Sequence, residues 1–434
     1  MPLGFHEDLA QLDHELGLAK SCDLSSRAKQ WSDWARSALE GSAGKAHRFT
    51  RVPEAWVPTV AMGHDGKPSA APAAPLQEQR AMWGGLWQGG KGGDTRGSFT
   101  WPADAPCHSL PLLSVDDLRR TSTAFSLRTA SAPDGFHVRH FGLLSDQALG
   151  TLAQLLRLIE ATGMWPSQVS QLIVALLAKP SGGFRPIGVF PGIYRLWMKS
   201  RGGLCMQWES SHELDCFAMG KHRSPVDVVW RQAVRAEASV CTGQSAANLF
   251  WDLVKFFESL SHSRMYVEAR ALEYPLAILR LQLAGYAFPR HLSLEGMVAE
   301  AVEPYRGVVA GCGGATTLVK VYYYRPFSSF TLRNPCVQFD AYIDDTQLAA
   351  EGQPDRVVEN LIDAAIDLAE VITETLGSEI SMPKAALVAS DSSISKRIRS
   401  ALGQKAGMFV YSARNLGIDS NAGKARALGV PLPW

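Results

Sequence analysis

Apolar and polar residues alternate between residues 337 and 343, and this period of two predicts a β-strand. Residues 346–349 are typical of the return strand of a hairpin, so the adjacent Asp344 and Asp345 would lie at its tip, where aspartate is common. Two carboxylates this close repel each other, and residues 339–352 contain no lysine or arginine that could relieve them. The pair is therefore either an ordinary surface turn or part of a site that binds a cation.

Other segments have the spacing of helices or of buried strands. Helical spacing predicts helices over residues 5–41, 146–162, 193–201, 255–271 and 355–376. Short apolar runs bounded by turn residues predict strands over residues 171–179, 184–190 and 247–253. The last of these runs carries Asp252 near its end. Strands and helices segregated in this way predict an α+β fold, in which a sheet carries helices on one face.

Residues 61–108 differ in composition from the rest of the chain. MGHDGKPSAAPAAPLQ and WGGLWQGGKGGDTRGSF are rich in glycine, proline and alanine. Such a composition is typical of a mobile linker or a long loop. We therefore predict a linker here, whose tryptophans have no partner that the sequence can assign.

The composition indicates a globular protein inside the cell. The chain has 434 residues, of which 46% are apolar, and this is enough for one large core or for two to three domains. No apolar run approaches the roughly 18 residues that a membrane span needs, and the N-terminus lacks the pattern of a signal peptide. Seven scattered cysteines are typical of reduced thiols. We expect a nuclear or cytoplasmic location, no secretion and no membrane partner.

Charge is balanced overall but uneven along the chain. The formal net charge is +1, which neither favours nor excludes a nucleic acid partner. Residues 161–208 contain no acidic residue, although they carry the cations Lys179, Arg185, Arg195, Lys199 and Arg201. This segment either faces an anion or serves only as a well-solvated surface.

Asp252 changes the interpretation of the aspartate pair. If its strand lies beside the predicted hairpin, Asp252, Asp344 and Asp345 would meet at one edge of the sheet, and their pKa values would rise unless a cation lies among them. Oxygen ligands at a partly hydrated site suit Mg²⁺. Two such ions, roughly 3.5–4 Å apart, can activate a hydroxyl and stabilise the leaving group of a phosphoryl transfer. Lys179 and Arg185 could hold a triphosphate opposite these carboxylates.

These segments, in this order, resemble the reverse transcriptase family, and most closely the enzymes of non-LTR retrotransposons. The resemblance extends from about residue 134 to residue 420. The matching segments are DGFHVRHF (134–141), AKPSGGFRPIGVFPGIYRLWMKSR (178–201), FWDLVKFFESL (250–260), RGVVAGCGGATTLVKVYY (306–323), AYIDD (341–345), LGSEISMPKAALV (376–388) and ARNLGID (413–419).

The resemblance implies a right-hand polymerase with fingers and a ferredoxin-like antiparallel palm sheet. A thumb is expected to follow the last palm motif, and this sequence has no residues left to form one. It also implies an RNA template, a DNA primer and dNTPs as partners, two Mg²⁺ ions or Mn²⁺ in their place, and a partner chain as one source of a thumb. The expected parts are a helical extension (1–60), the linker (61–108), fingers (109–240), palm (241–422) and a tail (423–434).

The resemblance also implies roles for single residues. Asp252 and Asp344 would be the main metal ligands, with Asp345 as a supporting carboxylate. Lys384 would donate a proton to pyrophosphate, or be an ordinary surface lysine. The residues implied to contact the nucleotide or the nucleic acid backbone are Lys179, Arg185, Phe257, Ala310, Gly311 and Tyr342. Phe257 would exclude a ribose 2′-hydroxyl by its bulk, or be an ordinary core residue.

Several positions depart from the family's pattern. Ala310 stands where a glutamine usually contacts the nucleotide, Glu258 occupies the second acidic position after Asp252, and Phe256 replaces a small residue. Two alternatives to an active reverse transcriptase follow. One is an inactive, truncated remnant that only binds nucleic acid. The other is an RNA-dependent RNA polymerase, which Ile343 and Phe257 disfavour because that class usually has glycine before the paired aspartates and must accept ribonucleotides.

Overall fold

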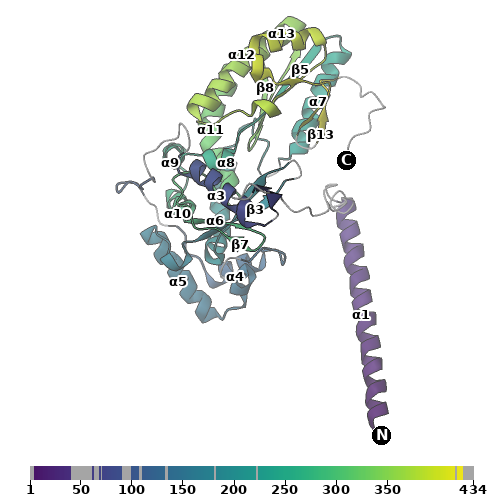
Figure 1. Ribbon diagram of the computed structural model, residues 1–434, viewed down its shortest axis with the longest axis vertical. Coiled ribbons are helices and arrows are strands. Elements are labelled where there is room, and N and C mark those ends of the chain that lie inside the picture. The colour runs from purple at the N-terminus through teal and green to yellow at the C-terminus, as the bar shows by residue number, and fades with distance from the viewer. Residues whose placement is uncertain are drawn as a thin grey trace. The chain divides into compact units, whose positions relative to one another are not determined.

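The computed structural model describes residues 4–40, 61–62, 68–69, 71–89, 99–106, 110–131, 135–179, 182–220, 223–415 and 418–423. The chain divides into two compact units, Met1–Pro58 and Thr59–Trp434. In the first unit, α1 (Gly4–Glu40) is the helix that the spacing of residues 5–41 predicts. All other elements belong to the second unit (Figure 1). None of the described helices is both long and apolar enough to cross a membrane.

The second unit contains a five-stranded sheet in the order β11-β10-β5-β9-β8. Its strands are β5 (Ser245–Asp252), β8 (Gln338–Tyr342), β9 (Asp345–Gly352), β10 (Ala386–Ala389) and β11 (Met408–Phe409). β8 and β9 form the hairpin predicted from the alternating residues, and β9 pairs with β5 along its whole length. The strands from β10 to β8 are antiparallel, but β11 runs parallel to β10, so the predicted purely antiparallel sheet is wrong at this edge.

Helices cover both faces of this sheet, which contradicts the predicted arrangement with helices on one face. On one face lies the main core, which contains Leu249 and Trp251 of β5. On the other face lies α7 (Pro225–Cys241), which runs beside β5 (Figure 1), and its Ala236 belongs to the same buried cluster as Ala246 of β5. Successive residues of β5 point to opposite faces of the sheet, so Ala246 lies on the α7 side while Ala247 belongs to the main core. The helices are α7 (Pro225–Cys241) on this face and α11 (Ala315–Arg333), α12 (Pro354–Glu370) and α13 (Ser392–Leu402) on the core face.

A four-stranded sheet in the order β4-β3-β6-β7 lies in the same unit. β3 (Leu172–Ala178) and β4 (Phe184–Val189) form the predicted hairpin, while β6 (Arg290–Leu294) pairs parallel with β3 and antiparallel with β7 (Met297–Val298). β6 and β7 come from the segment predicted as palm, so the boundary expected at residue 240 does not separate the two sheets. The remaining longer helices are α4 (Val115–Thr123), α5 (Asp146–Thr162), α6 (Gly192–Ser211), α9 (His262–Ala271) and α10 (Leu276–Tyr286).

The predicted linker contains a helix, α3 (Ala73–Trp87), and the linker prediction is wrong for these residues. Leu76, Trp83 and Trp87 are buried by it, and the two tryptophan rings stack with centroids 6.1 Å apart. Alanine favours helices, and Pro75 lies in the first turn, where proline is tolerated. The composition of the segment hid a short apolar stripe that packs on the core.

The helix predicted over residues 255–271 is broken in two. α8 (Phe256–Ser259) ends before Leu260, which is extended, and Ser261 then caps α9 by accepting a hydrogen bond from the amide of Arg264. The serine competes with a continuous helix because its hydroxyl satisfies an amide at the new helix start. This break leaves backbone carbonyls of α8 available to other parts of the chain.

Asp340 of β8 is a buried carboxyl on the face that α7 covers. Burial raises the pKa of its carboxyl to about 6, although the cations Arg231 and Arg235 of α7 oppose this shift. Arg231 Nη2 lies 3.9 Å from Asp340 Oδ1. Because the pKa is higher in the folded state, the stabilising contribution is complete below the unfolded pKa near 3.8 and is lost as the pH rises through about 6.

We therefore expect Asp340→Asn to become relatively more stable than the wild type as the pH rises. Urea unfolding should show the difference in free energy of unfolding growing by about 2 kcal/mol between about pH 4 and pH 7.5. Asp363→Asn on α12, at an exposed position, is the matched control and should show a much smaller change. A difference for Asp340→Asn that stays constant with pH would contradict this account.

Candidate active site

Three carboxylates from two separate segments meet at one end of the five-stranded sheet. Asp252 ends β5 and lies directly opposite Asp345, the first residue of β9. Asp344 lies in the turn between β8 and β9, and its carbonyl oxygen accepts a hydrogen bond of 3.0 Å from the amide of Leu253. The structure thus brings together the three aspartates that the sequence groups into one predicted site.

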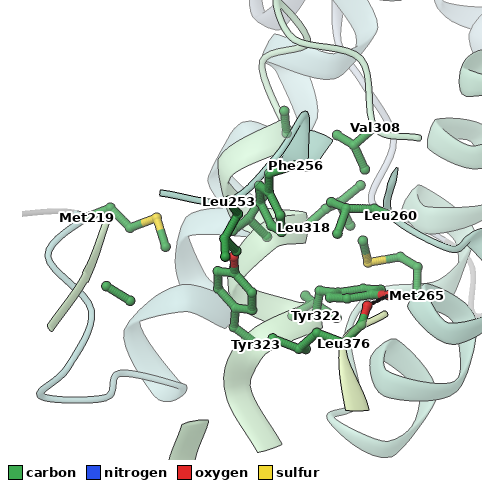
Figure 2. Close-up of a cluster of buried hydrophobic side chains, with 14 of the residues drawn as sticks. Met219, Leu253, Phe256, Leu260, Met265, Val308, Leu318, Tyr322, Tyr323 and Leu376 are labelled. Carbon is green, nitrogen blue, oxygen red and sulfur yellow. Dashed lines mark hydrogen bonds between the residues drawn. The ribbon is translucent and has the colours of Figure 1, made fainter. Parts of the chain in front are cut away.

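The turn that carries Asp344 is strained and is held from behind. Ile343 has φ +59°, a left-handed conformation that is unusual for a β-branched residue. Its carbonyl oxygen accepts a hydrogen bond of 2.9 Å from the hydroxyl of Tyr323 on α11. Tyr323 is fully buried and stacks on Phe256, with ring centroids 5.2 Å apart (Figure 2). The large Phe256 therefore supports the turn through Tyr323.

The carboxyls of Asp344 and Asp345 are harder to ionise than a free aspartate. Burial raises the pKa of Asp345 to about 6, and the negative charges of Asp344 and Asp252 add to this effect. Burial also raises the pKa of Asp344, with Asp252 acting in the same direction and the cations Lys384 and Arg185 opposing it. The site is therefore unfavourable for its own negative charges and favourable for additional positive charge.

Lys384 makes direct contact with this carboxylate cluster. Its Nζ lies 2.6 Å from Asp252 Oδ2. The side chain of Lys384 is 64% exposed, so water screens the pair and the contact contributes little to stability. Within the described ranges, no group of three or more His, Cys, Asp or Glu side chains has the arrangement of metal ligands. The cation in contact with the cluster is a lysine ammonium.

Of the two cations predicted to bind a triphosphate, Arg185 lies near the carboxylates. It is exposed on β4, and its charge lowers the pKa of Asp344, which it can do only from nearby. Lys179 is exposed at the turn between β3 and β4, where its amide donates to the carbonyl of Gly183 at 3.0 Å. The hairpin thus presents two cations, and Arg185 is the one with a direct electrostatic effect on the cluster.

The five cations of the acid-free segment do not form one surface. Arg201 is buried, and its Nη2 pairs with Glu160 Oε2 of α5 at 2.6 Å. Lys199 donates to the carbonyl of Ala124 at 2.7 Å and lies over the ring of Phe125. The prediction of a single anion-facing segment is wrong for Arg201, because its acidic partner comes from a preceding helix.

The glycine-rich loop 306–314 connects the cation hairpin to the carboxylate strand. Ala310 accepts a hydrogen bond of 2.7 Å from the amide of Gly188 on β4. The amide of Val308 donates to the carbonyl of Phe257 at 2.7 Å. Gly311 has φ +107°, and a Cβ there would lie 2.5 Å from the carbonyl oxygen of Gly188, so only glycine fits. Ala310, Gly311 and Phe257 are therefore tied to each other through the backbone.

Phe257 and Tyr342 are both partly buried and pack against the core. Phe257 follows α8's first residue, five positions after Asp252, and Tyr342 ends β8 opposite Asp345. Both residues therefore lie on elements that also carry or border the carboxylates. Their predicted contacts with a nucleotide and with a nucleic acid backbone stay predictions.

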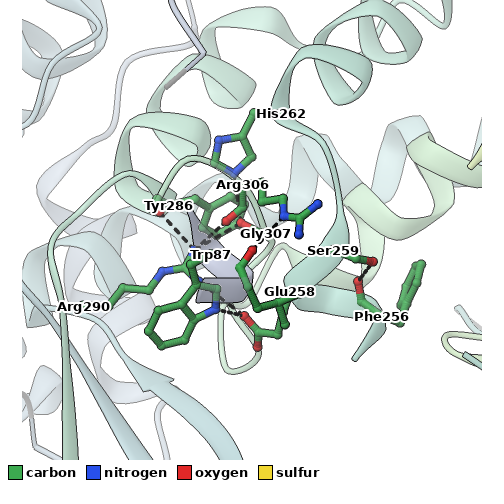
Figure 3. Close-up of polar contacts among 10 residues, drawn as sticks. Trp87, Phe256, Glu258, Ser259, His262, Tyr286, Arg290, Arg306 and Gly307 are labelled. Carbon is green, nitrogen blue, oxygen red and sulfur yellow. Dashed lines mark hydrogen bonds and ion pairs between the residues drawn. The ribbon is translucent and has the colours of Figure 1, made fainter. Parts of the chain in front are cut away.

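Glu258 belongs to a different, buried cluster. Its Oε2 accepts a hydrogen bond of 2.5 Å from Trp87 Nε1 and lies 3.3 Å from Arg290 Nη1 (Figure 3). Trp87 and Arg290 were not among the predicted site residues. Trp87 could have been found from its helical spacing to Trp83, whereas Arg290 gives no signal in the sequence because its partner comes from a distant segment.

A cavity of about 870 Å³ lies behind the glycine-rich loop and was also not predicted. Gly311 and Gly313 of the loop line one side, and Arg195 and Lys199 of α6 line another. Phe125, over whose ring Lys199 Nζ lies at 4.1 Å, completes an aromatic wall. The lining combines glycine backbone, an aromatic ring, the cations Arg195 and Lys199, and the acidic residues Glu209 and Glu213, of which Glu209 pairs with Lys320 at 2.6 Å.

No family model matches the sequence, and no curated protein matches it. The solved structures that resemble the chain include apo telomerase from Candida tropicalis, truncated from the C-terminal domain, with a TM-score of 0.42 and 10% sequence identity. The match covers 64% of this chain and 59% of the telomerase chain.

The support that Tyr323 gives to the turn can be tested by comparing its substitution with that of the adjacent Tyr322. Tyr323→Phe should lower the free energy of unfolding by about 1–1.5 kcal/mol, because the carbonyl of Ile343 loses a buried partner. Tyr322→Phe removes an equivalent hydrogen bond of 3.0 Å to Leu376 and should cost a similar amount. Hydrogen exchange at the Leu253 amide, which bonds Asp344, should accelerate only in Tyr323→Phe. Equal acceleration in both variants would exclude a specific support of the turn.

Proposed function

We propose that the chain is an RNA-directed DNA polymerase of a retrotransposon-like element, which transfers nucleotides to a primer 3′-hydroxyl. The observation that carries the proposal is the position of Asp252 directly opposite Asp345, with Asp344 in the adjoining turn. The motifs that resemble reverse transcriptases supply the reaction class. The arrangement of carboxylates, an adjacent lysine and a nearby arginine supports it.

The donor atoms of the carboxylate cluster are of the kind that a hard divalent cation prefers, and side-chain rotation would have to bring them into ligand geometry. Asp252, Asp344 and Asp345 offer only carboxylate oxygens, and a bound cation would reduce the repulsion among these three neighbouring charges. Asp252 and Asp344 would hold the ions, Mg²⁺ or Mn²⁺, with Asp345 in support. When bound, two such ions would favour the ionised primer hydroxyl and neutralise charge on the leaving pyrophosphate.

The chain's own cations would bind the triphosphate and assist its departure. Arg185 can contact phosphate oxygens in a bidentate manner, and Lys179 at the tip of the same hairpin adds a second positive charge. Lys384 Nζ, 2.6 Å from Asp252, is the group that would donate a proton to pyrophosphate. Its exposed ion pair can open at little cost, which would free the ammonium for this step.

Phe257, Ala310 and Gly311 would surround the sugar and base of the incoming dNTP. The flat ring of Phe257 would leave room for a deoxyribose and clash with a 2′-hydroxyl. Gly311 allows close approach of the backbone, and Ala310 would offer its backbone rather than the side-chain amide of a glutamine. Tyr342 would contact the primer or template backbone beside the carboxylates.

The cavity behind the glycine-rich loop would take part of the RNA template. Arg195 and Lys199 can attract phosphates, and an unpaired base would stack on Phe125 once Lys199 moves from the ring that it now covers. Binding through phosphates should weaken as the salt concentration rises. This proposal gives the cations of α6 a role that is separate from holding the triphosphate.

The carboxylates can be tested by primer extension on an RNA template with Mg²⁺ and dNTPs. Asp252→Asn and Asp344→Asn should each lower the rate by about a hundredfold or more, because each removes a ligand charge. Asp363→Asn, at an exposed position of α12, is the matched control and should retain wild-type activity. If the wild type extends no primer above the level of both site variants but still binds RNA, the polymerase proposal fails and an inactive nucleic-acid-binding protein is favoured.

Phe257 can be tested through the choice of sugar. Phe257→Val should increase incorporation of NTPs relative to dNTPs by about tenfold or more, since space for the 2′-hydroxyl opens. The neighbouring Phe256→Leu should reduce activity toward both sugars alike, because Phe256 acts through the turn. Unchanged discrimination in Phe257→Val would assign that ring to the core and not to the nucleotide.

A further inference from the structure

The C-terminal end of α3 lies directly beneath the start of the glycine-rich loop. The amide of Tyr305 donates to the carbonyl of Trp87 at 2.9 Å, and Arg306 Nε donates to the carbonyl of Leu86 at 2.8 Å. Two consecutive residues that lead into the loop are thus bound to the end of one helix. This helix comes from the segment whose composition predicts a linker.

Trp87 also connects to the loop through a buried ionic cluster. Trp87 is 1% exposed, and its Nε1 donates to Glu258 Oε2 at 2.5 Å. The Arg290 guanidinium lies 4.7 Å from the centroid of the Trp87 ring and 3.3 Å from the same carboxylate oxygen. Since Arg290 and Glu258 are both buried, each depends on the other and on Trp87 for compensation of its charge.

The opposite side of Arg290 holds the loop itself. Its Nη2 donates to the carbonyl of Gly307 at 3.3 Å, and His262 Nε2 lies 2.9 Å from the same oxygen (Figure 3). Burial lowers the pKa of His262 to about 4, so the ring is neutral and donates through Nε2. Gly307 has φ +95°, which strains any other residue, and a Cβ there would crowd the backbone of Glu258 at 3.0 Å.

We infer that α3 is part of the proposed nucleotide site and that Trp87 is a positioning residue for the glycine-rich loop. This inference rests on the proposed function. Trp87 orients Glu258, Glu258 orients Arg290, and Arg290 fixes the carbonyl of Gly307. The next residue, Val308, donates to Phe257, so the position of the loop determines where that ring lies. A change at Trp87 should therefore reach the nucleotide without any direct contact.

The chain offers a matched pair of variants on the same helix. Trp87→Phe keeps a ring near Arg290 but removes the hydrogen bond to Glu258. Trp83→Phe, one turn earlier, removes a hydrogen bond of similar kind, since Trp83 Nε1 donates to Gln79 at 3.0 Å and both residues are buried. Among the described residues, Trp83 makes no hydrogen bond to the glycine-rich loop, and its ring stacks on that of Trp87 in a contact that phenylalanine can keep. The two variants should therefore lose comparable stability and differ in their effect on the site.

Two readouts separate positioning from general stability. In primer extension, Trp87→Phe should raise the KM for dNTPs about fivefold with little change in kcat, and Trp83→Phe should raise the KM much less, because it leaves the hydrogen bond from Trp87 to Glu258 in place. In hydrogen exchange, the amides of Gly307 and Val308 should exchange faster in Trp87→Phe than in Trp83→Phe at equal overall stability. If the wild type proves inactive, the proposed function fails, and the exchange measurement still decides on the positioning of the loop.

A second variant covers the case in which Trp87→Phe does not fold. Glu258→Gln keeps the shape and the acceptor for Trp87 but removes the charge that faces Arg290. It should accelerate exchange at Gly307 in the same way as Trp87→Phe. The inference is overturned if the amides of Gly307 and Val308 exchange as slowly in the folded variant, Trp87→Phe or Glu258→Gln, as in the wild type. It is also overturned if Trp83→Phe accelerates their exchange as much as Trp87→Phe does.

Discussion

The pairing of β5 with β9 is the interaction on which the candidate site depends. The ladder begins at Ser245 opposite Gly352 and ends with Asp252 opposite Asp345. A slip of one residue would turn Leu249 and Trp251, both almost fully buried, away from the core. Their burial therefore fixes the register, and the register fixes which acidic residues face each other. The carboxylate cluster is placed by hydrophobic packing and not by any attraction among its members.

Bringing the three carboxylates together is electrostatically unfavourable, and the stability of the rest of the fold must offset the repulsion. Asp344 and Asp345 are partly buried beside Asp252, and both have raised pKa values. Arg185 and Lys384 reduce the repulsion, yet Arg185 reaches the cluster from the second sheet and Lys384 is exposed. Neither is a buried partner that would neutralise the site permanently. A cluster so arranged responds strongly to any further cation or to a phosphate that engages the two basic residues.

The sequence predicts the parts of this site better than it predicts their support. The hairpin follows from a local alternation of residues, and the short apolar runs mark β3, β4 and β5, since each signal lies within a few residues. α3 was missed because Leu76 and Trp83 are embedded among glycine, proline and alanine. The helix on the second face of the sheet depends on small residues such as Ala246, which give no strong signal. Arg201 looked like a free cation because its partner Glu160 lies on another helix.

The glycine-rich loop connects these observations, because it is bound to both sheets at once. Its Ala310 accepts from β4 of the four-stranded sheet, and its Val308 donates to Phe257, which follows β5 of the five-stranded sheet. Lys179 and Arg185 come from the hairpin of the four-stranded sheet, and the carboxylates come from the end of the five-stranded sheet. A movement of one sheet relative to the other would therefore strain the hydrogen bonds of this short loop. At Gly311 a side chain would clash with the carbonyl oxygen of Gly188. The buried cluster of Trp87, Glu258 and Arg290 holds the start of this loop through the carbonyl of Gly307. This contact gives α3, which lies outside the segments that resemble reverse transcriptases, a place in the core.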